Sequence, residues 1–338
     1  MQTLPQKRPL VNGYFRSTNA YSASRLHMVA RKSVAEKTLT HREWGGRLMK
    51  QYLFNLLPPA TVAAILTFWA LAPAAWVDSW WMITAVGLVV LAFVQLMEFV
   101  AERHTGWRIS RQEFLTDLFC VLLGITAISF ASDTLANSPM AEVKEALGLA
   151  TPWIGKLPFL VQVAMVMLLV EFGQYWLHRW MHNNAFLWST HAPHHHITQL
   201  NAMKGYVGNP IELFLISLSV IALLDFDKAP MFAAFNALGA ISYYAHANVR
   251  ADPPKWFSFF FTTIQHHSLH HTAESFEDTR CNYGNCVILF DRMFGTFREG
   301  ESAIAGQDDR RHLTIREQFL FPFLPWIARR QERQASMD

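Results

Sequence analysis

The sequence predicts an all-α fold, a multi-pass helical bundle in the membrane with a histidine-rich cap at its cytoplasmic face. Three observations predict it. Charged residues make up 16% of the 338 residues, against about 25% in typical soluble domains. Hydrophobic residues make up 51%. Uncharged apolar runs also recur at the length of about 20 residues that a membrane-spanning helix needs.

The chain begins with a basic segment, residues 1–50. It holds ten Lys or Arg and only two acidic residues, Glu36 and Glu43. A solvated leader would look the same, but the apolar runs beyond it favour a cytoplasmic segment against anionic lipid. No apolar core of a secretory leader occurs within the first thirty residues. The three cysteines form no framework, which indicates a reducing compartment.

Four membrane spans are predicted, at residues 51–77, 79–97, 114–132 and 157–176. Residues 133–156 are expected to form a long link between the last two. A further apolar pair, 211–224 and 229–245, predicts a helical hairpin. Its arms are short, so the pair either spans the membrane or is re-entrant and packs on the other helices. The sequence leaves both alternatives open.

The orientation follows from the basic residues of the short loops. The loop after the second span holds Arg103, Arg108 and Arg111, whereas the loop between the first two spans holds Asp78 and no basic residue. Because Lys and Arg are retained on the cytoplasmic side, the N-terminus is expected there. The fourth span then returns the chain to the same side near His178.

Histidines are concentrated in one part of the chain, with eleven of the 15 between residues 178 and 271. They form three patterned groups and one lone residue: His178 with His182, then HxxHH at His191, His194 and His195, the lone His246, and HxxHH again at His267, His270 and His271. On a helix the positions i, i+3 and i+4 share one side, so each HxxHH is expected to offer three imidazoles to a common site. His196 and His266 are interpreted as neighbours.

The patterned groups contain nine imidazoles, which exceeds the needs of one metal ion and suits two. Imidazole binds Fe, Zn, Cu and Ni alike. Arg179 stands where the HExxH motif of zinc proteases needs Glu. A metal-bound ring usually gives its second N–H to an acceptor. Glu171 and Asp117, ionisable residues in apolar runs, are candidates for that role. Asn282 and Asp291 are further candidates, although turn or cap roles explain them as well.

The motifs "HRWMH", "HAPHH" and "HSLHH", followed by "NYGNCVILFDRMFGTF", resemble the fatty acid hydroxylase (sterol desaturase) superfamily of integral-membrane enzymes. The resemblance runs from about residue 98 to 297. Beyond residue 297, the apolar stretch "FLFPFLPWIARRQERQ" with its basic flanks predicts an interfacial C-terminal tail over 298–338. The resemblance implies a domain over 51–297, with boxes at 178–182, 191–195 and 267–271. It also implies a non-haem site with two iron ions that uses O₂ and two electrons on lipid C–H bonds. The implied ligands are His178, His182, His191, His194, His195, His246, His267, His270 and His271.

The sequence is consistent with three interpretations of function. The first is a lipid hydroxylase, the second a lipid or sterol desaturase with the same site, and the third a His-rich metal-binding membrane protein or transporter. A transporter would place its ligands near the bilayer midplane, and here they follow the spans. No HPGG signature of cytochrome b5 occurs, so a separate donor is expected, resembling cytochrome b5, ferredoxin or rubredoxin. With a net charge of +3, no nucleic-acid partner is expected.

Overall fold

The computed structural model describes residues 41–307, 310–324 and 326, and their regular structure is helical apart from two isolated β-bridges. The chain divides into two units, residues 50–321 and residues 1–49 with 322–338. The nine patterned histidines all lie in the unit 50–321. The predicted basic segment 1–50 lies outside the described residues up to residue 40, and so does most of the predicted tail beyond residue 324.

Four helices are long and apolar enough to cross a membrane, which confirms the number of predicted spans. They are Leu48–Leu71 within α1 (His41–Leu71), α3 (Met82–Val100), the continuous helix Arg111–Ala146 and α7 (Phe159–Met181). In each of the first three, 17% of the apolar window is buried by the protein itself. The remaining apolar surface faces outward, as a lipid environment requires.

The third span is longer than predicted. It continues through α4 (Arg111–Leu123), α5 (Ser129–Ser132) and α6 (Ser138–Ala146), which are joined by π-helical turns at Gly124–Ile128 and Asp133–Asn137. Much of the expected link is therefore helical. Pro139 lies just after the second of these π-helical turns and has no N–H to donate to the preceding turn of the continuous helix. At Gly124 a Cβ atom would lie 2.7 Å from the Tyr206 ring, so the close approach there needs glycine.

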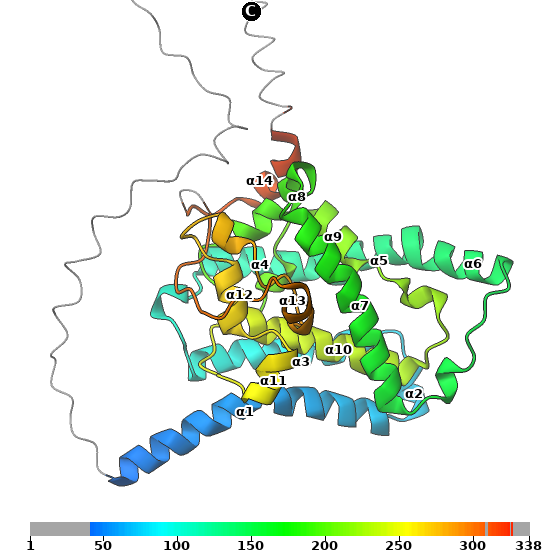
Figure 1. Ribbon diagram of the computed structural model, residues 1–338, viewed down its shortest axis with the longest axis horizontal. Helices are drawn as coiled ribbons and strands as arrows, with labels where there is room; N and C mark the ends of the chain where they lie inside the picture. The colour runs from blue at the N-terminus through cyan, green and yellow to red at the C-terminus, as the bar shows by residue number, and fades with distance from the viewer. Residues whose placement is uncertain (1–40, 308–309, 325, 327–338) are drawn as a thin grey trace, which may run out of the picture. The chain divides into compact units, whose positions relative to one another are not determined.

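The predicted hairpin consists of two unequal parts. Its first arm is α9 (Pro210–Ser217) with the 3₁₀ turn Val220–Leu223, which is too short to cross a bilayer. Its second arm is α10 (Lys228–His246), most of whose second half is buried. α10 packs against α7, α3 and α12 (Ile264–His270), as the centre of Figure 1 shows. α10 therefore packs on three other helices, and the position of the pair relative to the membrane stays a prediction.

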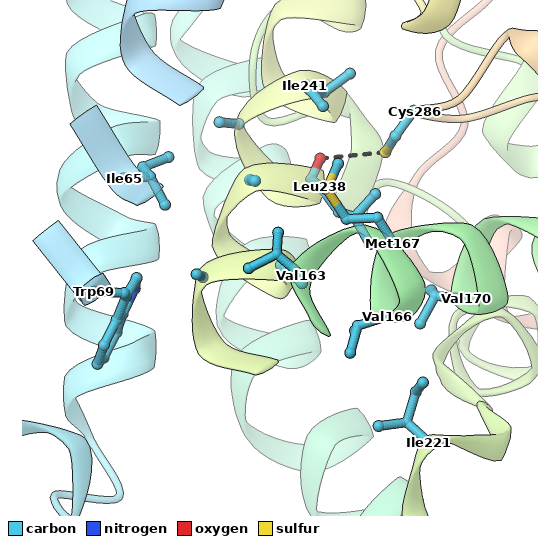
Figure 2. Packing of buried hydrophobic residues seen from close by; sticks show 14 of the residues in the cluster. Ile65, Trp69, Val163, Val166, Met167, Val170, Ile221, Leu238, Ile241 and Cys286 are labelled. Carbon is cyan, nitrogen blue, oxygen red and sulfur yellow. Dashed lines mark hydrogen bonds between the residues drawn. The ribbon is translucent and has the colours of Figure 1, made fainter. Parts of the chain in front are cut away.

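The main apolar core joins α1, α7 and α10. Figure 2 shows Ile65 and Trp69 of α1 on one side of α10 and the Val163–Val170 face of α7 on the other. Four alanines of α10 let the neighbours approach closely: Ala233, Ala234, Ala237 and Ala240. The indole N–H of Trp69 donates to Asn236 over 2.9 Å, and the Cys286 thiol donates to the Leu238 carbonyl.

Several helix ends meet at one end of this core. Glu98, near the end of α3, accepts the backbone N–H groups of Ala202 and Asn248. Asp117, near the start of α4, pairs with Lys204. α7 and α10 end at the same place, beside α8 (Ala185–His195) and α12. The segment after residue 297 joins them, because Glu301 binds Arg103 and Thr272 bridges to Ala305. This end of the bundle carries the histidines.

Candidate metal centre

All nine patterned histidines are buried where four helices end. His178 lies in the last turn of α7 and His182 caps it. The first HxxHH ends α8, His246 ends α10, and the second HxxHH ends α12. Their ring nitrogens converge into two groups in which one nitrogen of each residue lies within 4.8 Å of the others. The group of five is His178, His182, His191, His195 and His270, and the group of four is His194, His246, His267 and His271.

Each HxxHH divides its rings between the two groups, which differs from the expected common site for all three. His191 and His195 join the group of five, while His194 joins the group of four. The second box does the reverse, because His267 and His271 join the four and His270 the five. At about 100° per residue, positions i and i+4 lie about 40° apart and i+3 lies about 100° from i+4. Each of the two boxes therefore contributes rings to both groups.

For four of the rings, the surroundings determine which ring nitrogen carries the hydrogen. The Nδ1 atoms of His178, His194, His246 and His270 lie 2.6–2.9 Å from backbone carbonyl oxygens, those of Tyr283, Val207, Ser242 and Cys281. Burial lowers the pKa of His194 to about 4 and that of His246 to about 3, so both are neutral at pH 7. A carbonyl only accepts, so Nδ1 carries the hydrogen and Nε2 presents a lone pair.

The Nε2 atoms crowd one another in a way that hydrogen bonds do not explain. Nε2 of His191 lies 3.0 Å from that of His178, 3.1 Å from that of His182 and 3.0 Å from that of His195. One ring nitrogen has one hydrogen or one lone pair, so it cannot bond to three others. Ligands at right angles around a metal ion, with metal–nitrogen bonds of about 2.1 Å, would lie about 3.0 Å apart. A bound metal ion would explain this spacing in the group of five, and the convergence of one nitrogen from each residue makes each of the two groups able to hold an ion.

A carboxyl group that the sequence analysis missed supports His191. Oε1 of Glu212, on α9, lies 2.6 Å from Nδ1 of His191. Burial raises the pKa of Glu212 to about 8 and lowers that of His191 to about 3, so without a metal the contact joins two neutral groups. Glu212 lies in the apolar stretch "NPIELFLI". The criterion that selected Glu171 and Asp117, an ionisable residue in an apolar run, would have found it.

The four acceptors suggested by the sequence do not contact the rings of the nine histidines by any hydrogen bond in the described residues. Glu171 accepts the N–H groups of Cys286 and Val287, and Asp117 binds Asn201 and Lys204. Glu171 therefore holds a backbone segment, and Asp117 binds two side chains. The acceptors that the rings do use are mostly carbonyls, which a sequence does not distinguish from one residue to the next.

Asn282 and Asp291 shape the loop that carries two of those carbonyls. Asp291 accepts the N–H groups of Tyr283 and Gly284, and the Asn282 amide donates to His266 and Arg298 carbonyls. Asn282 has a φ of 51°, and a Cβ at Gly284 would lie 2.5 Å from the Val287 carbonyl oxygen. The "NYG" turn thereby presents the carbonyls that hold His178 and His270.

His196 and His266 belong to neither group of rings. Nδ1 of His196 lies 2.8 Å from the Ala192 carbonyl, and its ring contacts Phe321. The ring of His266 contacts Phe297. Both were interpreted from the sequence as neighbours of the site, and the structure places them there.

Comparison with known proteins defines the class. The fatty acid hydroxylase family model matches residues 163–296, which include all nine histidines. The chain is 29% identical over 252 residues to an ornithine lipid hydroxylase of Rhizobium tropici, covering 72% of this chain and 75% of the relative. It is 31% identical over 152 residues to a Delta(7)-sterol-C5(6)-desaturase of Nicotiana tabacum (43% of this chain, 53% of the relative).

A third relative is human alkylglycerol monooxygenase, 26% identical over 141 residues, covering 40% of this chain and 31% of the relative. No solved structure matches the chain. The family model over residues 163–296 and these matches together support the fatty acid hydroxylase/sterol desaturase superfamily for this chain.

Proposed function

We propose that this protein is an O₂-dependent lipid hydroxylase with a non-haem site of two iron ions. The observation that carries the proposal is the convergence of nine buried imidazoles into two groups whose Nε2 atoms face one another. Hydroxylation is preferred because a relative matched over 75% of its length is named a lipid hydroxylase. The catalytic domain would comprise residues 51–297, with the nine histidines as ligands.

The protein's own residues have separable roles. Bound iron would supply the oxidising chemistry that an unactivated C–H bond requires. The carbonyls of Tyr283, Val207, Ser242 and Cys281 keep Nδ1 protonated and so keep Nε2 available to a metal. Glu212 does the same for His191 and would add negative charge beside a bound cation. Burial of the rings excludes water from the reacting groups.

The same ligands would also serve a desaturase, the second candidate, which the tobacco sterol desaturase match favours. The two reactions differ in their products. Hydroxylation adds one oxygen atom to the lipid, whereas desaturation removes two hydrogens and leaves no oxygen in it. The substrate is proposed only as a membrane lipid, with fatty acyl, sterol, ether-lipid and aminolipid classes included.

The decisive experiment supplies purified protein with iron, an electron donor, the cell's own lipids and ¹⁸O₂. We expect a lipid product heavier by one oxygen and labelled with ¹⁸O, and we expect chelation of iron to abolish it. A product lighter by two hydrogens and without label would establish the desaturase instead. Iron-loaded protein that leaves every lipid unchanged while the donor remains functional would refute both.

The proposed orientation places the N-terminus and the histidines on the cytoplasmic side, where a separate donor resembling cytochrome b5, ferredoxin or rubredoxin would dock. It is supported by the basic loop that holds Arg103 and Arg108, between the candidate spans Met82–Val100 and Arg111–Ala146. An acidic carrier would be attracted to exposed basic residues there. The predicted interfacial tail, 298–338, remains a proposal for the residues beyond 324.

Cysteine labelling tests this orientation. Arg108 and Glu142 are both exposed and lie near opposite ends of the Arg111–Ala146 helix, and the three native cysteines are buried. In intact cells a membrane-impermeant maleimide should label Glu142→Cys, and it should label Arg108→Cys only after the membrane is opened. Labelling of Arg108→Cys in intact cells would reverse the proposed orientation, and labelling of both would contradict a span between them.

A further inference from the structure

The described structure has a pocket of about 370 Å³ close to the candidate metal centre. That volume lies within the range of small-ligand sites, about 300–1,000 Å³. None of the nine histidines of the centre lines the pocket. It is bounded by the start of α4, the Lys204–Tyr206 turn and α14 (Ile315–Leu320). Val207 also lines the pocket, and its backbone carbonyl accepts a hydrogen bond from Nδ1 of His194. Val207 is therefore in contact with both the pocket and the candidate metal centre.

Two residues that line this pocket each have a buried oxygen atom without a hydrogen-bond partner in the described structure: Oε1 of Glu113 and Oε1 of Gln318. Glu113 is 9% exposed and Gln318 is 4% exposed. The Gln318 amide N–H donates to the Leu313 carbonyl, which identifies the bare atom as the oxygen. Leaving a buried acceptor unsatisfied costs about 1–3 kcal/mol, so two in one pocket indicate a ligand that donates hydrogen bonds.

Two neighbouring basic side chains, His312 and Lys204, do not satisfy Oε1 of Glu113. Nε2 of His312 lies 3.4 Å from Glu113 Oε1, beyond the usual N–H···O range, and 2.8 Å from the Thr198 hydroxyl. Lys204 lies 2.8 Å from Asp117, and both side chains are buried, so this pair compensates itself. The other oxygen of Glu113 accepts the Ser110 N–H in the capping box of α4. One carboxylate oxygen therefore remains for a ligand.

We propose that this pocket binds a primary ammonium group through Glu113 and Gln318, and that the ammonium belongs to the head group of the lipid substrate. An ammonium ion has three donors and a positive charge, which suits two bare acceptors of which one is a carboxylate. The assignment of a head group rests on the proposed lipid hydroxylase function.

The position of the pocket favours a lipid as the source of the ammonium. Glu113 and Asp117 lie within the first two turns of a candidate span, about 3–9 Å along the helix from its start, which is the depth of lipid head groups. On the opposite side of these turns Phe114, Leu115 and Leu118 are exposed, as expected for a surface that contacts acyl chains. A head group in the pocket would leave its chains beside apolar helix.

Lipid retention tests the proposal without turnover. The full-length protein is purified from vesicles that contain equal amounts of two lipids with the same acyl chains, one with a primary ammonium head group and one N-acetylated. Mass spectrometry then measures the bound ratio. We expect wild-type protein to retain about tenfold more of the ammonium lipid, the effect of one hydrogen bond to a charged group. Equal retention of the two lipids by wild-type protein would overturn the proposal.

The chain offers a matched pair of variants. Glu113→Gln removes the charge but keeps a residue that can complete the capping box. Glu317→Gln makes the same change in the second capping box, with Thr314, and Glu317 does not line the pocket. We expect the preference to disappear in Glu113→Gln and Gln318→Met and to persist in Glu317→Gln. An equal loss in Glu317→Gln would attribute the effect to helix capping and refute the assignment.

Butylammonium chloride is the second probe, and it separates a head group from a free amine. Binding of butylammonium as tight as that of the ammonium lipid would overturn the head-group assignment in favour of a free amine. The retention assay also needs no O₂ and no donor. A protein that hydroxylates lipids but shows no head-group preference refutes this inference alone. A protein with the preference that converts no lipid refutes the proposed function alone.

Discussion

Replacing His194 and His267 together by leucine is expected to leave about one metal ion per chain, whereas replacing His194 and His195 is expected to remove both. The first pair comes from two boxes but from one group of rings, the group of four. The second pair comes from one box but from both groups. If each box instead served one ion, the two results would be exchanged. Metal analysis of the purified variants distinguishes the two arrangements.

The rate of lipid conversion should fall by more than about a hundredfold in both double variants. Loss of a residue that only orients a metal ligand already lowers metal affinity or activity by about 10–100-fold. His266→Leu is the control for metal content, because His266 is buried on the same helix as His267 and belongs to neither group. It should retain about two ions per chain. Loss of metal in His266→Leu without unfolding would show that the ligand assignment is incomplete.

Replacing Asp117 by leucine is expected to lower the free energy of unfolding by about 3–5 kcal/mol, because it leaves Lys204 charged and unpaired in the interior. The side chains of the pair are 1% and 4% exposed, and Nζ of Lys204 lies 2.8 Å from the carboxylate. The double variant Asp117→Leu/Lys204→Met should recover most of the loss, because it removes both charges. Thermal and denaturant unfolding in detergent measure both effects.

A matched control exists in the pair of Asp78 and Lys228. Its N–O distance is also 2.8 Å, but its side chains are 67% and 58% exposed. Asp78→Leu should therefore change stability little, because water already screens an exposed pair. If Asp117→Leu were as mild as Asp78→Leu, Lys204 would have another means of satisfying its charge, and the buried pair would not anchor α4 to the turn beside the metal centre.

The number of spans and the histidine clusters were predictable from the sequence because each depends on local pattern. A span needs only a sufficient apolar run, and an HxxHH box on a helix places its rings on one side whatever surrounds it. The charged stretch from Asp133 to Ala146 was not predictable as helix in the same way. Its composition resembles a loop, and an ion pair between Lys144 and Asp225, 81 residues apart, helps to hold it.

The sequence by itself indicated the nine histidines that could bind metal, and that the first two of them end an apolar span. Only the tertiary structure decided how they divide, because the group that each ring joins depends on how α7, α8, α10 and α12 are placed in space. The same holds for the support of the rings. Four Nδ1 atoms meet backbone carbonyls, which every residue has, and His191 meets Glu212, 21 residues away. Such partners are selected by distance in the folded chain, and no local pattern records that distance.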